Sequence, residues 1–180
     1  MANTIKLKRG TSTPTTSNIV DGEVAIDKTA KKLYVNDGGT IKEIGGGGFD
    51  QDSQGNLVAG TNAGDSFSGT SAEDNILIGE NAGTAITTGD KNIAIGTDAL
   101  KVNTDRSSHV AVGHEALKNT STGQYSWYGQ NNTGIGNQAL TANTIGYANT
   151  AIGNIALTAN QEGYSNTACG AGSLTSLNGN

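Results

Sequence analysis

The chain contains few of the residues that fill or crosslink an ordinary globular core. Its 180 residues include two phenylalanines, five tyrosines, one tryptophan and one proline, whereas a compact domain of this length usually buries more large side chains. The only cysteine, Cys169, has no partner for an internal disulfide, which favours folding in a reducing compartment. There is no run of about 18 apolar residues and no apolar segment near the N-terminus. We therefore expect neither a membrane span nor a secretion signal.

Charged and reactive side chains are too sparse or too scattered for several classes of function. The net charge is −5, and the basic cluster is limited to Lys6, Lys8 and Arg9, which argues against nucleic-acid binding. There are only two histidines, His109 and His114, and the acidic residues fall in different polar segments without a shared register. A pair of carboxylates converging on one cleft is not expected. The sequence predicts no enzymatic activity, no metal and no cofactor.

One segment superficially resembles the start of a calcium loop. Residues 50–56 alternate side-chain oxygens around Gly55, as in loops that wrap a hard cation. The twelfth position of that loop is Thr61 rather than glutamate. A polar turn that caps the following repeats is the preferred interpretation.

Glycine, in contrast, is abundant, with 27 residues, and it recurs at regular intervals. The repeat anchors are Gly60, Gly79, Gly96, Gly113, Gly136, Gly153 and Gly170. They are separated by 19, 17, 17, 23, 17 and 17 residues. A second glycine follows ten residues later in four copies, at Gly89, Gly123, Gly146 and Gly163. The chain is therefore built largely of one repeated structural unit.

The repeated register extends to the residues around each anchor. A small residue stands three positions after the anchor, and in most copies a leucine follows it, at Leu100, Leu117, Leu140, Leu157 and Leu174. Asparagine stands four positions before every anchor except one, where His109 takes its place. The clearest copy, residues 149–153, reads Asn-Thr-Ala-Ile-Gly. We expect His109 to replace one rung of an asparagine side-chain ladder.

Only about four residues alternate before each anchor, too few for an independent hairpin, so each unit must pair with the units above and below it. The sequence predicts an all-β chain in which residues 56–180 form a β-solenoid, or β-roll, of about seven coils. We expect the leucines after the anchors to line its interior. A second inward file is expected from the residues just before the anchors, namely Ala59, Ile78, Ile95, Val112, Ile135, Ile152 and Cys169.

The first 44 residues differ from the repeats and predict a small β-hairpin module. Ile5 and Leu7 alternate with lysines, residues 23–26 and 32–35 are short apolar strands, and Asn36-Asp37-Gly38-Gly39 is strong turn chemistry before a strand over 40–44. Residues 45–55 form a glycine-rich hinge and turn, because four consecutive glycines carry no side chains to pack.

The 23-residue spacing marks an insertion of six residues around positions 124–130. It holds Tyr125, Trp127 and Tyr128, which include the only tryptophan. Insertions in solenoids become loops on one face, and clustered aromatic residues are good anchors for contacts with proteins or sugars. Packing of these rings across a subunit interface or over the roll is the preferred interpretation, and a contact loop is the alternative. Tyr147 and Tyr164, one coil apart in register, are expected to stack on the surface.

A roll this thin encloses little apolar volume, and its two ends expose unpaired strand groups. Side-by-side association of several chains would remedy both weaknesses. We therefore expect a parallel homotrimer.

The Asn-Thr-Ala-Ile-Gly repeats resemble the head repeats of YadA-like trimeric adhesins and, more closely, the 17-residue arrays of bacteriophage tail fibres. Residues 4–44 resemble the N-terminal module of phage tail-fibre and tropism-determinant proteins. This resemblance implies a trimeric fibre in the virion, assembled in the host cytoplasm. Its N-terminal module would bind a tail, baseplate or adaptor protein, and its shaft would extend toward a distal fibre protein or a host receptor.

Two alternative functions belong to other classes. A trimeric bacterial surface adhesin would need an export signal and a membrane anchor. An ice-binding solenoid is suggested by a threonine file at Thr133, Thr150 and Thr167, although an ice-binding face needs a broader regular array.

Overall fold

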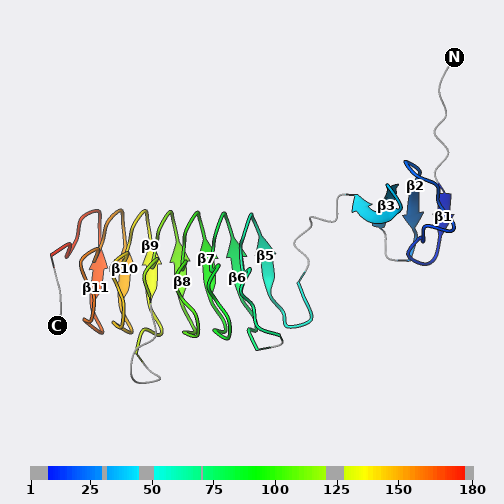
Figure 1. Cartoon of the computed structure of the whole chain (residues 1–180). Coiled ribbons are helices and arrows are strands. Elements are labelled where there is room, and N and C mark those ends of the chain that lie inside the picture. The colour runs from blue at the N-terminus through cyan, green and yellow to red at the C-terminus, as the bar shows by residue number, and fades with distance from the viewer. Residues whose placement is uncertain (1–7, 30–31, 45–50, 70, 121–127, 177–180) are drawn as a thin grey trace, which may run out of the picture. The chain divides into compact units, whose positions relative to one another are not determined.

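The computed structural model describes residues 8–29, 32–44, 51–69, 71–120 and 128–176. Within these residues the chain forms strands and turns and no helix, which confirms the all-β prediction (Figure 1). It divides into two compact units, residues 1–48 and 49–180. Each unit has its own sheet. The predicted tetraglycine hinge, together with Ile5 and Leu7, lies outside the described residues.

The first unit is a four-stranded sheet rather than a simple hairpin. Its strands are β1 (Lys8–Gly10), β2 (Val24–Asp27), β3 (Lys32–Asp37) and β4 (Thr40–Ile44), in that spatial order. The last three form the expected antiparallel arrangement, and β3 turns into β4 through Gly38 and Gly39, both at positive φ. β1, however, pairs parallel to β2. Parallel pairing requires a crossover, which residues 11–23 provide.

The second unit is a parallel β-solenoid with one three-residue strand per coil. Its strands are β5 (Leu57–Ala59), β6 (Ile76–Ile78), β7 (Ile93–Ile95), β8 (Val110–Val112), β9 (Thr133–Ile135), β10 (Thr150–Ile152) and β11 (Thr167–Cys169). They lie side by side in sequence order, so each coil pairs only with its neighbours (Figure 1). The pairing register follows the predicted repeat without a slip, for example Ile152 against Cys169. The predicted β-solenoid is therefore confirmed.

The anchor glycines share an unusual backbone conformation, and all but the last lie too close to the next coil to admit a side chain. Their φ angles lie between 121° and 138°, a region that side chains with a Cβ rarely adopt. In all but the last coil the backbone of the next anchor passes directly over them. A Cβ at Gly136, for example, would lie 2.4 Å from the carbonyl oxygen of Gly153. The close contact between successive coils thus explains why glycine recurs at these positions.

The interior file expected from the residues before the anchors is wrong. Ile95 and Ile135 are 37% exposed, Ile152 is 42% exposed, and Cys169 is exposed as well. The residues one position earlier point inward instead, and Ala94 and Ala151 are completely buried. The asparagine four positions before each anchor faces inward. Side chains in a strand alternate between its two faces, so the residue two positions before the anchor also faces inward, and the residue just before the anchor faces outward.

The second expected file, of leucines, is confirmed for all but its last member. Leu100, Leu117, Leu140 and Leu157 are completely buried, whereas Leu174 in the last coil is 47% exposed. All five have φ near 50°, the left-handed conformation. This conformation costs a leucine roughly 1 kcal/mol, which burial of its side chain offsets.

Side-chain size is balanced between the two interior positions. Where a coil has glycine in place of leucine, at Gly64 and Gly83, the strand beside it carries the large residue Leu77. A Cβ at Gly83 would lie 2.8 Å from a Leu77 methyl group. Where the leucine is present, the inward strand residue is small, and a Cβ on Gly134 would already crowd Leu117 at 3.3 Å. The layers with a leucine after the anchor thus pair it with a small strand residue, whereas the layer at Gly83 holds both Leu77 and Ile86.

Substitution of two anchor glycines separates two contributions to the loss of folding stability, namely backbone strain and overlap with the next coil. Gly136→Ala is expected to cost about 3 kcal/mol, because its methyl group overlaps the next coil. Gly170→Ala shares the positive φ but meets nothing within 4 Å, and should cost only about 1 kcal/mol. Urea unfolding followed by circular dichroism measures both. Equal losses would show that contact between coils does not set the glycine requirement.

Candidate functional site

A ladder of buried polar side chains runs through the interior of the roll. Its rungs are Asn56, Asn75, Asn92, His109, Asn132 and Asn149, all at most 2% exposed. A typical rung accepts, at its Oδ1, the backbone N–H of the next rung, as Asn132 does from Asn149 at 3.0 Å. Its amide nitrogen donates to a carbonyl on the return of its own coil, as Asn149 does to Gly163 at 2.6 Å. The expected ladder is confirmed, and its chemistry is structural.

His109 fills its rung with a longer and titratable side chain. Its backbone N–H donates to Asn92 at 3.0 Å, and its Nδ1 accepts the Asn132 N–H at 3.3 Å. Burial of the ring, together with the nearby charge of Arg106, lowers the pKa of His109 to about 4. A proton on Nδ1 would also face the Asn132 N–H. The ladder therefore holds a neutral imidazole.

The ladder predicts a specific acid sensitivity. Between pH 6.5 and about 4 the unfolded chain binds a proton at His109 that the folded chain does not, so the free energy of unfolding falls as the pH drops through that window. The loss is up to about 3 kcal/mol. His109→Asn restores the repeated amide and should remove this loss.

Urea unfolding at pH 7 and pH 4.5 checks the effect. His114→Asn, a change at an exposed histidine, is the matched control and should leave the acid sensitivity in place. The interpretation fails if His109→Asn is as acid-sensitive as the original chain.

The outer face of the seven-stranded sheet is apolar over most of its length. None of the strand residues from β5 to β11 is charged. The outward residues in the earlier strands are aliphatic, and the row containing Ile95, Ile135 and Ile152 reaches 42% exposure. The threonine file at Thr133, Thr150 and Thr167 lies on this face, and it covers only β9 to β11. The face thus combines regular spacing with uncovered apolar surface.

Three tyrosines stack along one edge of the roll, which we call the tyrosine ladder. The rings of Tyr147 and Tyr164 are nearly parallel at 4.9 Å between centroids, which confirms the expected pair. Tyr128 adds a third ring, 6.3 Å from Tyr147 and inclined by 26°. Sequence reasoning placed Tyr128 in the inserted loop and did not connect it with the pair. Tyr125 and Trp127 lie outside the described residues.

Backbone pairing locates the insertion and explains the position of Tyr128. The N–H groups of Asn131 and Ala148 donate to the carbonyls of Ser107 and Gln130, so Gln130 is the register equivalent of Tyr147. The six additional residues therefore precede Gln130. Tyr128, two residues before the register position, reaches Tyr147 from the end of the insertion. Gly123, expected as a second glycine of the repeat, lies outside the described residues, and Gly129 follows the insertion in the equivalent place.

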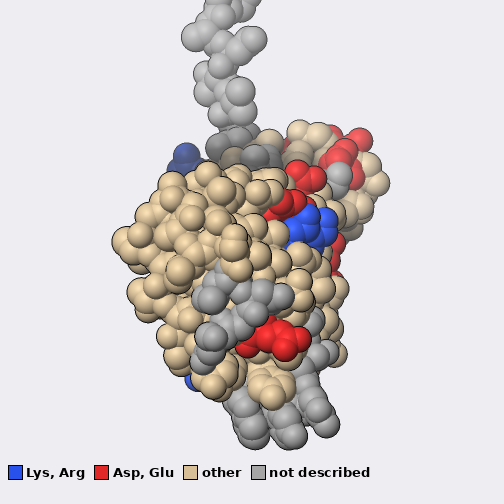
Figure 2. All heavy atoms as spheres, turned by 90° about the vertical axis from the view of Figure 1, so that its left-hand side faces the viewer, with Lys and Arg blue, Asp and Glu red and all other residues tan. Residues whose placement is uncertain are grey.

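Charged side chains gather in the middle coils. Lys118 bridges Asp98 at 3.5 Å and Glu115, and Lys101 also pairs with Asp98 at 3.2 Å. These contacts lower the pKa of Glu115 and raise that of Lys118. The coils after the insertion are different. Figure 2 looks toward β11, and most of the described atoms on that side belong to uncharged residues.

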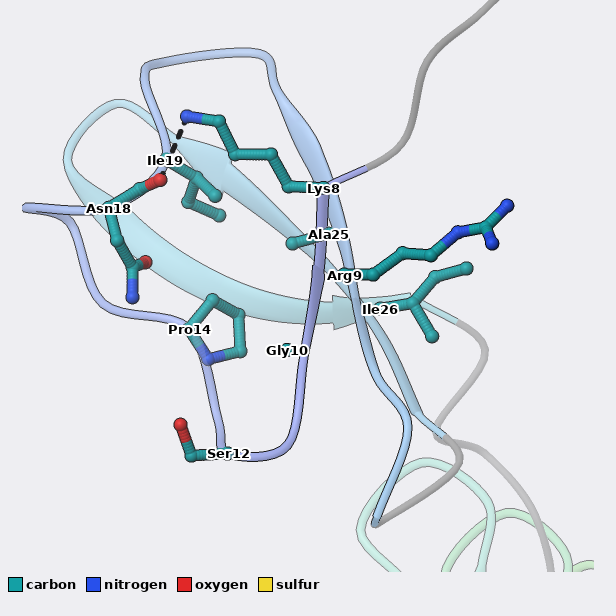
Figure 3. A pocket seen from close by; sticks show the side chains of 9 residues that line it. All are labelled: Lys8, Arg9, Gly10, Ser12, Pro14, Asn18, Ile19, Ala25 and Ile26. Atoms are coloured by element: carbon teal, nitrogen blue, oxygen red, sulfur yellow. Dashed lines mark hydrogen bonds between the residues drawn. The ribbon is translucent and has the colours of Figure 1, made fainter.

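The first unit contains a cavity of about 200 Å³ beside its edge strand β1. Pro14, Ile19 and Ala25 line its apolar side, and Lys8 reaches across to the Asn18 carbonyl at 2.9 Å (Figure 3). Lys8 also pairs with Glu23 at 2.8 Å. The charge of Lys8 is therefore already compensated within the unit. The cavity is a small recess beside an exposed strand, with an apolar side.

The segment that resembled a calcium loop is a hydrogen-bonded polar turn at the start of the roll. Asp52 accepts the backbone N–H groups of Gln54 and Asn56 at 2.9 and 2.8 Å, and the Asn56 side-chain amide at 3.0 Å. Its oxygens are thus used within the turn, as the preferred interpretation required. Among the described residues no group of three histidine, cysteine, aspartate or glutamate side chains could hold a metal. Nor does the described part contain a helix that could cross a membrane.

No family model, curated protein or solved structure matches this chain.

Proposed function

We propose that this chain is a structural component of a bacteriophage tail fibre, anchored by residues 1–44 and extended by the solenoid toward the host. The observation that carries the proposal is the combination of a coil repeated in strict register with an apolar outer sheet face. Such a roll gains length by adding coils and contains no cleft with converging reactive groups among its described residues. The resemblance of both segments to phage fibre sequences supports the virion as its location.

The outer sheet face supports self-association into a parallel homotrimer. Parallel sheets normally have both faces covered, and here the inner face packs on the core while the outer face is open. An apolar stripe that runs the length of a rod is self-complementary when identical rods lie side by side. Three copies packed through β5 to β11 would bury it, and the resemblance to trimeric fibres favours three rather than two.

The first unit supports attachment to a partner protein. Its edge strand β1 is exposed along its whole length, and the apolar recess lies beside it. An edge strand next to a pocket is the arrangement that accepts an extended segment of a partner protein by strand addition. A tail, baseplate or adaptor protein would be that partner.

The trimer is tested by a matched pair of substitutions. Ile152 lies on the outer sheet face and Val102 lies off it, and both side chains are 42% exposed. Ile152→Asp should dissociate the trimer, because three carboxylates would be buried together, whereas Val102→Asp should leave it intact. Sedimentation equilibrium measures the mass. A monomeric original chain, or equal effects of the two changes, contradicts the proposed assembly.

The location is tested on particles. Mass spectrometry of purified virions carrying this gene should detect the chain, and antibodies against residues 1–44 should label the tail in electron micrographs. Absence of the chain from intact virions contradicts a role in the fibre.

A further inference from the structure

The last three coils have an unusual composition for an exposed surface. From Tyr128 to Asn180 the sequence contains one charged side chain, Glu162, and no lysine, arginine or histidine. The preceding coils, by contrast, carry the network around Asp98 and Lys118. A ligand that contacts the last coils therefore meets amides, hydroxyls, aliphatic groups and tyrosine rings. An anionic ligand would find no cation there.

The tyrosine ladder is the prominent feature of this neutral region. Stacking covers the facing sides of neighbouring rings, whose centroids are 6.3 Å apart for Tyr128 and Tyr147 and 4.9 Å apart for Tyr147 and Tyr164. Tyr164 ends the row and is 44% exposed. The ladder thus offers a row of three tyrosine rings, of which that of Tyr164 is the most exposed.

Polar residues flank the ladder, and Glu162, two residues before Tyr164, is the one charged residue among them. Asn131, Gln161 and Ser165 are exposed and lie within a few residues of its members. A row one ring wide, bordered by amide and hydroxyl groups, differs from the broad apolar stripe on the sheet face. It provides hydrogen-bond donors and acceptors for a ligand that is rich in hydroxyl groups, together with aromatic surface for its C–H faces.

We propose that the tyrosine ladder binds a neutral carbohydrate chain that runs along the roll, with successive sugar units beside successive coils. The proposal rests on the proposed function, because it assigns the host-contact role of the fibre to these coils. Single-stranded nucleic acid also stacks on aromatic residues, but its phosphates require a cationic groove that this region lacks. A protein partner would be favoured by a wider apolar surface, which the ladder does not provide.

The experiment uses the full chain and immobilised polysaccharides. The neutral probes are dextran, laminarin, mannan and galactan, and the anionic probes are alginate and chondroitin sulfate. We expect at least one neutral polysaccharide to bind and neither anionic one. Tyr164→Ala, which removes the accessible ring, should weaken the binding by at least about tenfold. Tyr164→Phe keeps the ring and should stay within about threefold of the original chain.

Controls separate binding from folding. Val102→Ala changes an equally exposed side chain away from the ladder and should leave the affinity unchanged. Circular dichroism melting verifies that each variant retains the roll, since loss of one stacked ring removes only about 1 kcal/mol. The proposal is overturned if no neutral polysaccharide binds, if folded Tyr164→Ala binds as well as the original chain, or if only the anionic probes bind. Sedimentation and virion labelling test the fibre role without involving the tyrosine ladder. A failure of the carbohydrate-binding experiment therefore does not contradict the fibre role.

Discussion

The close approach of successive coils at the anchor glycines is the constraint on which the roll depends. The backbone of one anchor passes within a distance that a single methyl group would fill, and this holds for every coil that is followed by another. Contact this close fixes the register, because a slip by one residue would place a side chain at the crossing point. The parallel pairing, the asparagine ladder and the stacked tyrosines all repeat with that register.

The interior that results is narrow, and the chain fills it with two kinds of residue. Large aliphatic side chains, among them Leu77, Ile86 and the file of leucines, supply the apolar contacts, and buried amides satisfy the backbone where the coil turns. His109 is the rung where this scheme carries a titratable group. Little room remains inside for a ligand, so recognition by the solenoid must take place on its outer surfaces.

Those outer surfaces differ in chemistry along and around the roll. The sheet face is apolar, the middle coils carry paired charges, and the last coils are almost uncharged. An apolar stripe suits contact with identical chains, whereas a row of tyrosine rings suits a neutral, hydroxyl-rich ligand. The tyrosines lie outside the strands that form the sheet face, so the two surfaces are made of different residues. One chain could therefore serve both assembly and attachment.

The repeat could be recognised without a structure because each coil of a solenoid pairs with its neighbours. Each coil therefore requires the same residue types at equivalent positions of the sequence. Glycine spacing, the leucine file, the buried rung at His109 and the pair of Tyr147 and Tyr164 were all predicted on that basis. The outward direction of the side chains just before the anchors was not predicted. The two-residue period of a strand, combined with the inward asparagines, is sufficient to derive it.

The sequence by itself thus determined the coil, its length and its order, since these depend on contacts between equivalent positions. Only the tertiary structure decided that β1 runs parallel to β2 and that Tyr128 joins the ladder. These features depend on crossovers and on an insertion that breaks the repeat. Each of these features occurs once in the described part of the chain. The repeat pattern of the sequence therefore gives no information from which their geometry could be inferred.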